Sequence, residues 1–248
     1  MKILVCISRV PDSATRILIC SDGKSIDSKG IKFVVNPYDE FAIEEGIRLK
    51  EKNGGEVTVI TVGTEQSTDV LRTALAMGVD KAVLVKGEEP KDSYYVAKNI
   101  AEYAKELNPD IIILGRQSID FDSFQIPAEL GTMLGISAIS VVSELNIEGN
   151  KVIAEREIEG GKEIVETTLP CIISAQKGLN DPRYPKLPDI MKAKSKPIEE
   201  KTPVQTEERI TILGMTMPLK QRIGKLLTDS EDDLNELVRL LHEEAKVI

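Results

Sequence analysis

Residues 111–125 read Ile-Ile-Ile-Leu-Gly-Arg-Gln-Ser-Ile-Asp-Phe-Asp-Ser-Phe-Gln, and the rest of the chain is organised around this stretch. It opens as a short apolar run, which is typical of a parallel strand buried on both faces. The run ends at Gly115, and a polar segment follows in which Asp122 or Ser123 can cap a new helix. A strand, a glycine, a polar turn and a helix N-terminus together make a place where a nucleotide phosphate can sit.

Strand-like and helix-like segments alternate over about the first 130 residues. Short apolar runs predict buried strands, and apolar residues at helical spacing predict the helices between them. The expected strands span 2–7, 56–62, 81–85 and 111–115, and the expected helices span 37–52, 66–77, 93–107 and 122–134. This alternation predicts an α/β fold with a doubly wound, mostly parallel sheet of the Rossmann-like, adenine-nucleotide-binding type. Right-handed crossovers then place the loops that follow the strands on one edge of the sheet.

Two patterns add to this alternation. Residues 16–35 read as a hairpin excursion that ends at Asn36, where a helix can begin with Pro37 in its first turn and Asp39 completing a capping box. An antiparallel extension is expected later in the chain, followed by one more apolar strand. Its strands span 140–147, 151–158 and 163–168, and the apolar strand spans 170–174.

Composition divides the chain into an α/β domain (1–176), a basic segment (177–196) and a C-terminal arm (197–248). The basic segment carries six basic against two acidic residues, a local charge of +4, around an apolar group of Leu187, Ile190 and Met191. The residues alone support equally an exposed linker and a docking loop with an apolar anchor inside a ring of charge.

The arm contains a strand-like run at 209–213 and a final helix that begins at Ser230 with Asp233 in a capping box. Its apolar stripe must be buried on the chain's own body or on a partner. The stripe consists of Leu234, Leu237, Val238 and Leu241.

Charge and cysteine usage exclude several classes of function. The chain has 248 residues with 41 acidic and 32 basic side chains, a formal charge of −9, which argues against a general nucleic-acid binder. No apolar run is long enough to span a membrane. The cysteines (Cys6, Cys20 and Cys171) lie far apart in no metal-binding spacing, so we expect a reducing, cytoplasmic setting. His242 is the only histidine, which excludes a mechanism that needs two.

The central stretch carries the residue types of a nucleotide site without catalysis. No phosphate-loop, dinucleotide, nucleophile-elbow or zinc-protease motif occurs. Asp120 and Asp122 could hold a metal through oxygen, but no further carboxylates stand in fixed register, so no metal site is expected. Gly115 allows close approach to the backbone, and Ser118 and Ser123 supply neutral hydrogen bonds. The alternative is an ordinary strand–helix turn.

Three stretches carry a resemblance to one family, and the third of them is highly specific. The first is Gly115-Arg-Gln-Ser-Ile-Asp-Phe-Asp. The second is Ala154-Glu-Arg-Glu-Ile-Glu-Gly-Gly-Lys-Glu-Ile-Val-Glu followed by Leu169-Pro-Cys-Ile-Ile-Ser, and the third is Gly178-Leu-Asn-Asp-Pro-Arg-Tyr-Pro-Lys-Leu-Pro-Asp-Ile-Met-Lys-Ala-Lys. Through these stretches the chain resembles the β subunit of electron transfer flavoprotein over nearly all of its length, with a weaker resemblance after about residue 200.

The resemblance implies a heterodimeric electron carrier. The α subunit would hold most of the FAD, and the β subunit would bind AMP in its own α/β domain without any catalytic residue. Carried over by position, the nucleotide contacts are Cys6, Asn36, Pro37, Tyr38, Asp39, Val62, Gly115, Arg116, Gln117, Ser118, Ile119, Asp120, Phe121, Asp122, Ser123, Phe124, Gln125 and Ile126.

The resemblance also implies partners. The basic segment matches the family's recognition loop for acyl-CoA dehydrogenase-type flavoenzymes of fatty acid β-oxidation, with Leu187 as the anchor and Ile190, Met191 and Lys192 beside it. Glu157 matches a carboxylate that helps to position the mobile flavin domain. The arm would embrace the α subunit, and electrons would pass on to a quinone oxidoreductase or a similar acceptor.

Ile126 and Pro127 depart from the family pattern. AMP-type members often carry a small polar residue and a glycine there, whereas electron-bifurcating members hold a second FAD and often carry an apolar residue at the position of Ile126. The other motifs resemble the AMP type more closely, so AMP is the expected ligand and a second FAD the alternative. Two rival classes are a nucleotide-sensing protein of the universal-stress type, which lacks the docking loop, and an adenylate-transferring enzyme, which the missing phosphate-loop motif disfavours.

Overall fold

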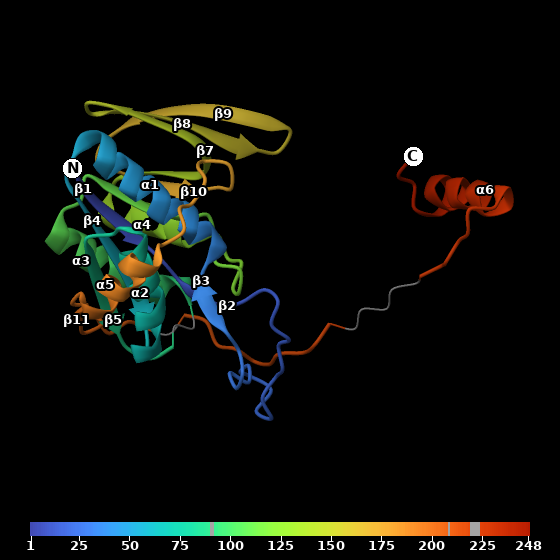
Figure 1. Ribbon diagram of the computed structural model, residues 1–248, viewed down its shortest axis with the longest axis horizontal. Coiled ribbons are helices and arrows are strands. Elements are labelled where there is room, and N and C mark those ends of the chain that lie inside the picture. The colour runs from blue at the N-terminus through green and yellow to red at the C-terminus, as the bar shows by residue number, and fades with distance from the viewer. Residues whose placement is uncertain (90–91, 208, 219–223) are drawn as a thin grey trace.

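The computed structural model describes residues 1–89, 92–207, 209–218 and 224–248, and its main feature is a large sheet with helices on both faces (Figure 1). Within these residues the sheet has nine strands in the order β11-β5-β4-β1-β6-β10-β7-β8-β9. The strands that pair in parallel are β1 (Lys2–Cys6), β4 (Glu56–Gly63), β5 (Lys81–Lys86), β6 (Ile111–Gly115), β10 (Cys171–Ala175) and β11 (Glu199–Lys201). The predicted doubly wound, mostly parallel α/β sheet is therefore confirmed.

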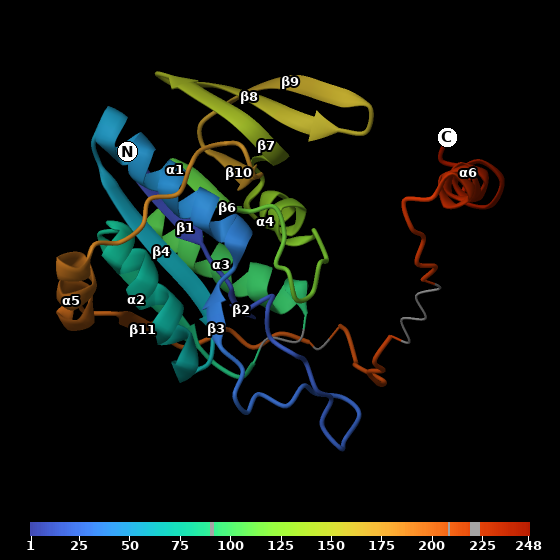
Figure 2. The same cartoon turned by 45° about the vertical axis from the view of Figure 1, so that its right-hand side comes forward.

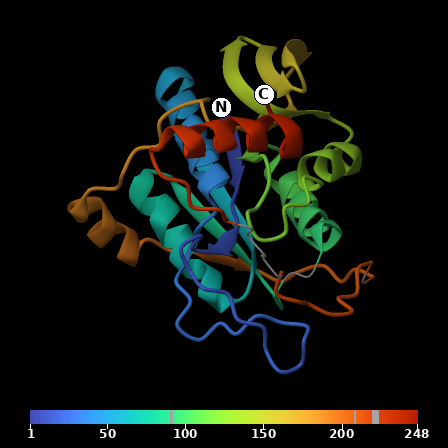
Figure 3. The same cartoon turned by 90° about the vertical axis from the view of Figure 1, so that its right-hand side faces the viewer.

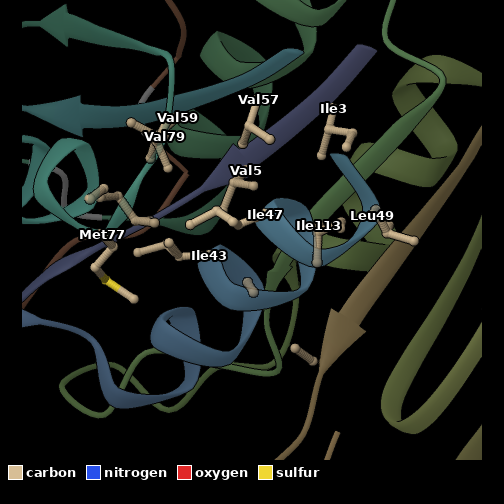
Figure 4. Packing of buried hydrophobic residues seen from close by; sticks show 14 of the residues in the cluster. Ile3, Val5, Ile43, Ile47, Leu49, Val57, Val59, Met77, Val79 and Ile113 are labelled. Carbon is tan, nitrogen blue, oxygen red and sulfur yellow. The ribbon is translucent and has the colours of Figure 1, made fainter. Parts of the chain in front are cut away.

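Helices cover both faces of the parallel strands, which explains their continuous apolar runs. On one face lie α1 (Pro37–Asn53) and α2 (Thr68–Met77), the latter preceded by a 3-10 turn at Glu65–Ser67. On the other face lie α3 (Ser93–Leu107) and α4 (Ile126–Leu134) (Figure 2). Successive strand residues alternate between the two cores. Figure 4 shows Val5 and Val59 packed with Ile43 and Ile47 of α1, whereas Leu4 belongs to the core under α3.

The antiparallel extension consists of β7 (Ser137–Glu148), β8 (Lys151–Ile158) and β9 (Gly161–Thr168). The first residues of β7 pair in parallel with β10, and the rest of this strand pairs with β8. Val141 has a positive φ of 65°, and the register shifts near it, so β7 bends away from the parallel layer there. The two hairpins β7–β8 and β8–β9 extend the sheet at one end (Figure 1).

A second, two-stranded sheet holds the base of the predicted excursion. Strands β2 (Arg9–Pro11) and β3 (Phe33–Val35) pair antiparallel, and residues 12–32 run out between them. Within the excursion, Ile19 and Ile26 form an isolated antiparallel bridge. Arg9 fixes this ribbon, because its guanidinium lies 3.8 Å from the centroid of the Phe33 ring and 3.0 Å from Asp69 of α2.

The basic segment is not only a loop. It contains helix α5 (Leu187–Ser195), which packs beside α2 (Figure 3). Directly after it, β11 joins the main sheet beside β5, so residues 199–201 of the predicted arm lie in the sheet. The strand-like run predicted at 209–213 is not a strand. In that part of the chain the Met215 amide donates instead to the carbonyl of Gly23 in the excursion, at 2.7 Å.

The arm ends in α6 (Glu231–Arg239), which continues as a π-helical turn over Leu240–Glu244. The Ser230 side chain caps the helix by accepting from the Asp233 amide at 3.2 Å, as predicted. The reciprocal half of the predicted capping box is wrong, because the Asp233 carboxylate accepts from the Thr228 amide instead, at 2.7 Å. Figures 1 and 2 show α6 apart from the sheet, and none of its residues is buried.

Across the ranges given above, the structure contains no helix that is both long and apolar enough to cross a membrane.

Candidate nucleotide-binding site

The candidate site lies at the carboxyl ends of β1 and β6, where the strand order reverses. From β1 the chain adds β4 and β5 on one side, and then it returns to add β6 on the other side of β1. In doubly wound sheets such a switch point leaves a crevice where ligands bind. Ser8 follows β1 and Gly115 ends β6, so the loop of residues 116–125, called the β6–α4 loop below, leaves the sheet at this crevice.

A pocket opens at this crevice between the end of β1, the first turn of α1, helix α3 and the β6–α4 loop. Its lining residues are Cys6, Ile7, Ser8, Asp39, Val96, Ile100, Leu114, Gly115, Arg116, Gln117, Ser118, Ser123, Phe124, Gln125, Ile126 and Pro127. The structure thus brings together most of the predicted contacts. Those that line the pocket are Cys6, Asp39, Gly115, Arg116, Gln117, Ser118, Ser123, Phe124, Gln125 and Ile126.

The other predicted contacts do not line the pocket. Val62 is buried at the end of β4 in the core under α3. Asp120, Phe121 and Asp122 are exposed in the middle of the β6–α4 loop. Ile119 belongs to the same part of the loop, and Asn36, Pro37 and Tyr38 belong to the start of α1.

Sequence reasoning missed several lining residues: Ile7, Ser8, Val96, Ile100 and Leu114. Ile7, Ser8 and Leu114 flank the two strand ends that form the switch point, so the strand pattern held a signal for them. Val96 and Ile100 are apolar residues at helical spacing, as buried core residues are. Nothing in this spacing shows that they line a pocket rather than the core.

Asn36 holds the β6–α4 loop in place. Its side chain is fully buried, and its amide nitrogen donates to the Gln117 carbonyl at 2.9 Å while its amide oxygen accepts from the Ile119 amide at 3.2 Å. Its backbone amide donates to the Ser8 carbonyl at 3.0 Å. Asn36 occupies the N-cap position of α1, where the helix was predicted to begin, but its side chain bonds to the loop and makes no capping bond.

Asp39 ties the ends of β1 and β6 together. Its buried carboxylate accepts from the backbone amides of Ser8, at 2.7 Å, and Gly115, at 2.9 Å, rather than completing a capping box. Burial raises the pKa of the Asp39 carboxyl to about 7, against the opposing effect of these hydrogen bonds, and the charge of Asp120 raises it further. This carboxyl therefore titrates much closer to neutral pH than an ordinary aspartate does.

Gly115 is required by packing. A Cβ atom at this position would lie 2.7 Å from the Tyr38 carbonyl carbon and would overlap the Asp39 carboxylate. The first turn of α1 fills the space that a side chain would need. Only glycine therefore allows β6 to pack this closely against Tyr38 and Asp39. This is a different reason from the close ligand approach that the sequence suggested.

Helix α4 begins later than predicted. Its first residue is Ile126 and its N-cap is Gln125, without a side-chain capping bond, so neither Asp122 nor Ser123 caps it. Asp122 and Phe124 have positive φ values of 55° and 63°, which no helix accepts. Pro127 gives the reason, because proline fits the first turn of a helix but would break a helix that had begun at Asp122.

Arg116 is the one cation among the lining residues. Its guanidinium lies 4.6 Å from the centroid of the Phe124 ring and 5.3 Å from that of Tyr38, and it donates to the side-chain oxygen of Gln176 at 3.2 Å. The Gln176 amide in turn donates to Glu157 on β8 at 2.9 Å. Gln176 therefore connects the pocket to the carboxylate predicted to position the flavin domain.

The predicted docking residues lie together on α5, away from the pocket. Leu187 is 73% exposed, Ile190 and Met191 are also exposed, and Lys192 is exposed 4.0 Å from Asp189. The structure therefore presents an apolar group and a cation on one short helix, and none of them belongs to either core cluster of the described residues.

The cysteines of the sheet are poor nucleophiles. Burial raises the pKa of the Cys171 thiol to about 12. Burial, with a smaller effect from the Asp39 charge, also raises the pKa of Cys6 at the pocket wall. A neutral, buried thiol contributes packing rather than reactivity.

These features define a Rossmann-like α/β protein with a pocket of polar and apolar residues at its switch point. A family model described as the electron transfer flavoprotein domain matches residues 24–205. The electron transfer flavoprotein β subunit of Bacillus subtilis (strain 168) is 42% identical over 259 aligned positions that cover 100% of both chains. The corresponding subunit of Bradyrhizobium diazoefficiens is 40% identical over 255 positions covering 100% of both chains, and that of Syntrophomonas wolfei is 36% identical over 94% of this chain and 92% of the relative.

The chain therefore belongs to the family of electron transfer flavoprotein β subunits. The resemblance inferred from the three sequence stretches is confirmed. Membership in this family argues against both the universal-stress class and the adenylate-transferring class.

Proposed function

We propose that the chain is the β subunit of a heterodimeric electron carrier in which an α subunit holds most of the FAD. The observation that carries this proposal is the separation of two surfaces: a pocket of polar and apolar residues at the switch point and, away from it, an apolar and basic helix α5. A carrier subunit needs a stable scaffold and a docking surface but no bond chemistry of its own. The relatives at 36–42% identity, all named as β subunits, support this role.

The pocket suits an adenine nucleotide with one phosphate group, and AMP is the ligand we propose. Arg116 offers a charge for the phosphate, and the Ser118 and Ser123 hydroxyls offer neutral hydrogen bonds. Val96 and Ile100 offer apolar surface for a base. The nucleotide would serve as a structural element of the pocket.

Nucleotide extraction tests this proposal. The complex with the α subunit is purified, denatured and analysed for FAD and AMP, and we expect one of each, whereas the isolated chain should be colourless. Arg116→Gln should lower AMP content at least fivefold and leave FAD unchanged. A complex that contains no adenine nucleotide other than one FAD would contradict the assignment of the pocket.

A second candidate ligand is a second FAD, as in electron-bifurcating relatives. The observation that favours it is the apolar part of the lining, where Phe124, Ile126 and Pro127 stand together. AMP-type relatives often carry a small polar residue and a glycine at the last two positions. Two FAD molecules per complex in the same extraction would establish this alternative.

We also propose roles for the surfaces outside the pocket. Leu187, with Ile190, Met191 and Lys192, would contact an acyl-CoA dehydrogenase-type flavoenzyme. Glu157 would help to position the flavin domain of the α subunit, and the C-terminal arm would pack on that subunit. A quinone oxidoreductase or a similar acceptor would take the electrons onward, as in fatty acid β-oxidation.

A further inference from the structure

The docking segment, residues 177–196, is bonded to the body of the protein on both sides of its exposed helix α5. The helix itself needs this support. It has nine residues, only Ala193 among them is buried, and isolated helices of this length are marginal in water. Its order must therefore come from contacts that hold the chain before and after it.

The first contact is an ion-pair cluster in which Arg183 meets Glu44 and Glu51 of α1. The Arg183 guanidinium donates to Glu44 at 2.8 and 3.0 Å and to Glu51 at 2.7 and 3.1 Å. The Arg183 backbone amide adds a bond to Glu44 at 3.1 Å. Glu44 is buried, so this bidentate pairing fixes the arginine more tightly than a surface ion pair would.

Neighbouring bonds extend the first contact along α1. The Asn180 amide donates to the Phe41 carbonyl at 3.0 Å and to the buried Glu45 carboxylate at 2.9 Å. Residues 180–183 therefore lie against α1 and set the direction in which the chain enters α5 (Figure 2).

The second contact lies at the other end of α5. Arg72 of α2 donates to the carbonyl of Ala193, at 2.6 Å, and to that of Lys196. The Lys196 ammonium donates to the Val79 carbonyl at 2.9 Å. Ala193 belongs to the main core, so this end of α5 is fixed by packing as well as by hydrogen bonds.

We propose that Arg183 is a positioning residue for partner docking, and that its pairing with Glu44 and Glu51 holds α5 in its docking conformation before a partner arrives. A surface that is ordered in advance loses less conformational freedom on binding, so the docked complex is tighter. The docking role itself rests on the function proposed above. The ordering of α5 does not, and it can be measured without any partner.

Hydrogen–deuterium exchange on the complex with the α subunit tests the ordering. Arg183→Gln removes the charge and the fork of donors. We expect backbone amides of residues 187–195 to exchange at least tenfold faster, with exchange in the parallel strands unchanged. Glu51→Gln, which alters only the outer and exposed carboxylate, should give a smaller increase, and it should add nothing in the Arg183→Gln background.

Arg48→Gln is the matched control. Arg48 also pairs with Glu44, at 3.1 Å and one turn along α1, but its one ion pair is with Glu44 and it makes no hydrogen bond to the docking segment among the described residues. The Arg48→Gln variant therefore removes a positive charge from beside Glu44, as Arg183→Gln does, but it leaves the bonds to the docking segment intact. We expect exchange in α5 within twofold of the unmodified protein.

The consequence for docking is measured with an acyl-CoA dehydrogenase reducing the carrier. Arg183→Gln should raise the KM for the carrier at least fivefold, with kcat and FAD content within twofold. Unchanged exchange in α5 would overturn the proposal, and so would faster exchange with an unchanged KM. An unmodified carrier that accepts no electrons from the dehydrogenase would instead contradict the proposed function, while the exchange result would still decide the ordering.

Discussion

Buried polar side chains hold the candidate pocket together from within. Asn36 and Asp39 follow β3 and bond to backbone groups of the loops after β1 and β6. Each backbone group bonded in this way would otherwise need another partner, because buried polar groups are costly when unpaired. These two residues are therefore supports of the pocket, and Asp39 also forms part of its wall.

Asp39 makes stability depend on pH. Its pKa in the folded chain, about 7, lies above the ordinary value of 3.8 expected in the unfolded chain. Between these values the folded state keeps a proton that the unfolded state loses, so the group favours folding below about pH 4, and this contribution is lost as the pH rises through 7. Asp39→Asn removes the titration. The difference in unfolding free energy between the original chain and the variant should fall by up to roughly 4 kcal/mol from pH 4 to pH 8.

Urea unfolding of the isolated chain at several pH values measures this difference. The charge that acts on Asp39 is that of Asp120, and the Cys6 thiol, which also interacts with Asp39, is neutral. Asp120→Asn is the control, because it should lower the pKa of Asp39 only slightly and preserve most of the pH dependence. A difference between the original chain and Asp39→Asn that stays constant from pH 4 to pH 8 would show that Asp39 is ionised throughout.

For individual residues, the sequence indicated which of them lie at the switch point but not which groups they bond to. The strand pattern and the family motifs pointed to Asn36, Asp39 and Gly115, and all three stand at the switch point. A capping role explains the residue types of Asn36 and Asp39 equally well, so their bonds across the sheet could not be distinguished from local caps in the sequence. Only the register of β1 beside β6 brings the partners within reach.

At the scale of elements, proline marks where helices begin. Pro127 limits the start of α4, as Pro37 does for α1, and Pro188 lies in the first turn of α5. The strands were predictable because the parallel layer is apolar throughout. Helix α5 was not, because its apolar residues face solvent and give no signal of burial. A strand was wrongly predicted at 209–213, because the apolar residues there alternate as in a strand but remain outside the sheet.

The exposed apolar face of α5 gives a prediction for docking. Leu187→Ala should change the unfolding free energy by less than about 0.5 kcal/mol, because its side chain is 73% exposed. Loss of a docking anchor typically costs about 2 kcal/mol, so electron acceptance from an acyl-CoA dehydrogenase should become roughly 30-fold less efficient in kcat/KM.

Ile164→Ala is the matched control for this measurement. Ile164 lies on β9 and is 70% exposed, so its truncation removes a similar apolar surface far from α5 along the chain. Equal rates for the original protein and Leu187→Ala would remove Leu187 as the anchor. Equal losses for both variants would show that apolar exposure in general, rather than α5, governs the transfer.

At the scale of the whole molecule, the first part of the arm is bonded to the body, whereas its last helix is not. After α5, strand β11 pairs with β5 at the edge of the sheet, and the Val204 amide donates to Asn99 of α3 at 2.8 Å. The Arg209 guanidinium then lies 3.5 Å from the centroid of the Tyr94 ring. The arm is thus fixed to the body near α3, whereas α6 presents exposed apolar residues to solvent.

Deletion of residues 225–248 tests whether the apolar stripe of α6 belongs to a partner. Leu234, Leu237 and Val238 are exposed and no residue of α6 is buried, so the isolated chain should lose no core and its Tm should change by less than about 2 °C. Association with the α subunit, measured by titration, should weaken at least tenfold, because the proposed interface loses its apolar surface. Leu234→Gln with Leu237→Gln, which keeps the length of the arm, should weaken association in the same direction. A large fall in the Tm of the isolated truncated chain, with association unchanged, would show instead that the stripe packs on the chain's own body.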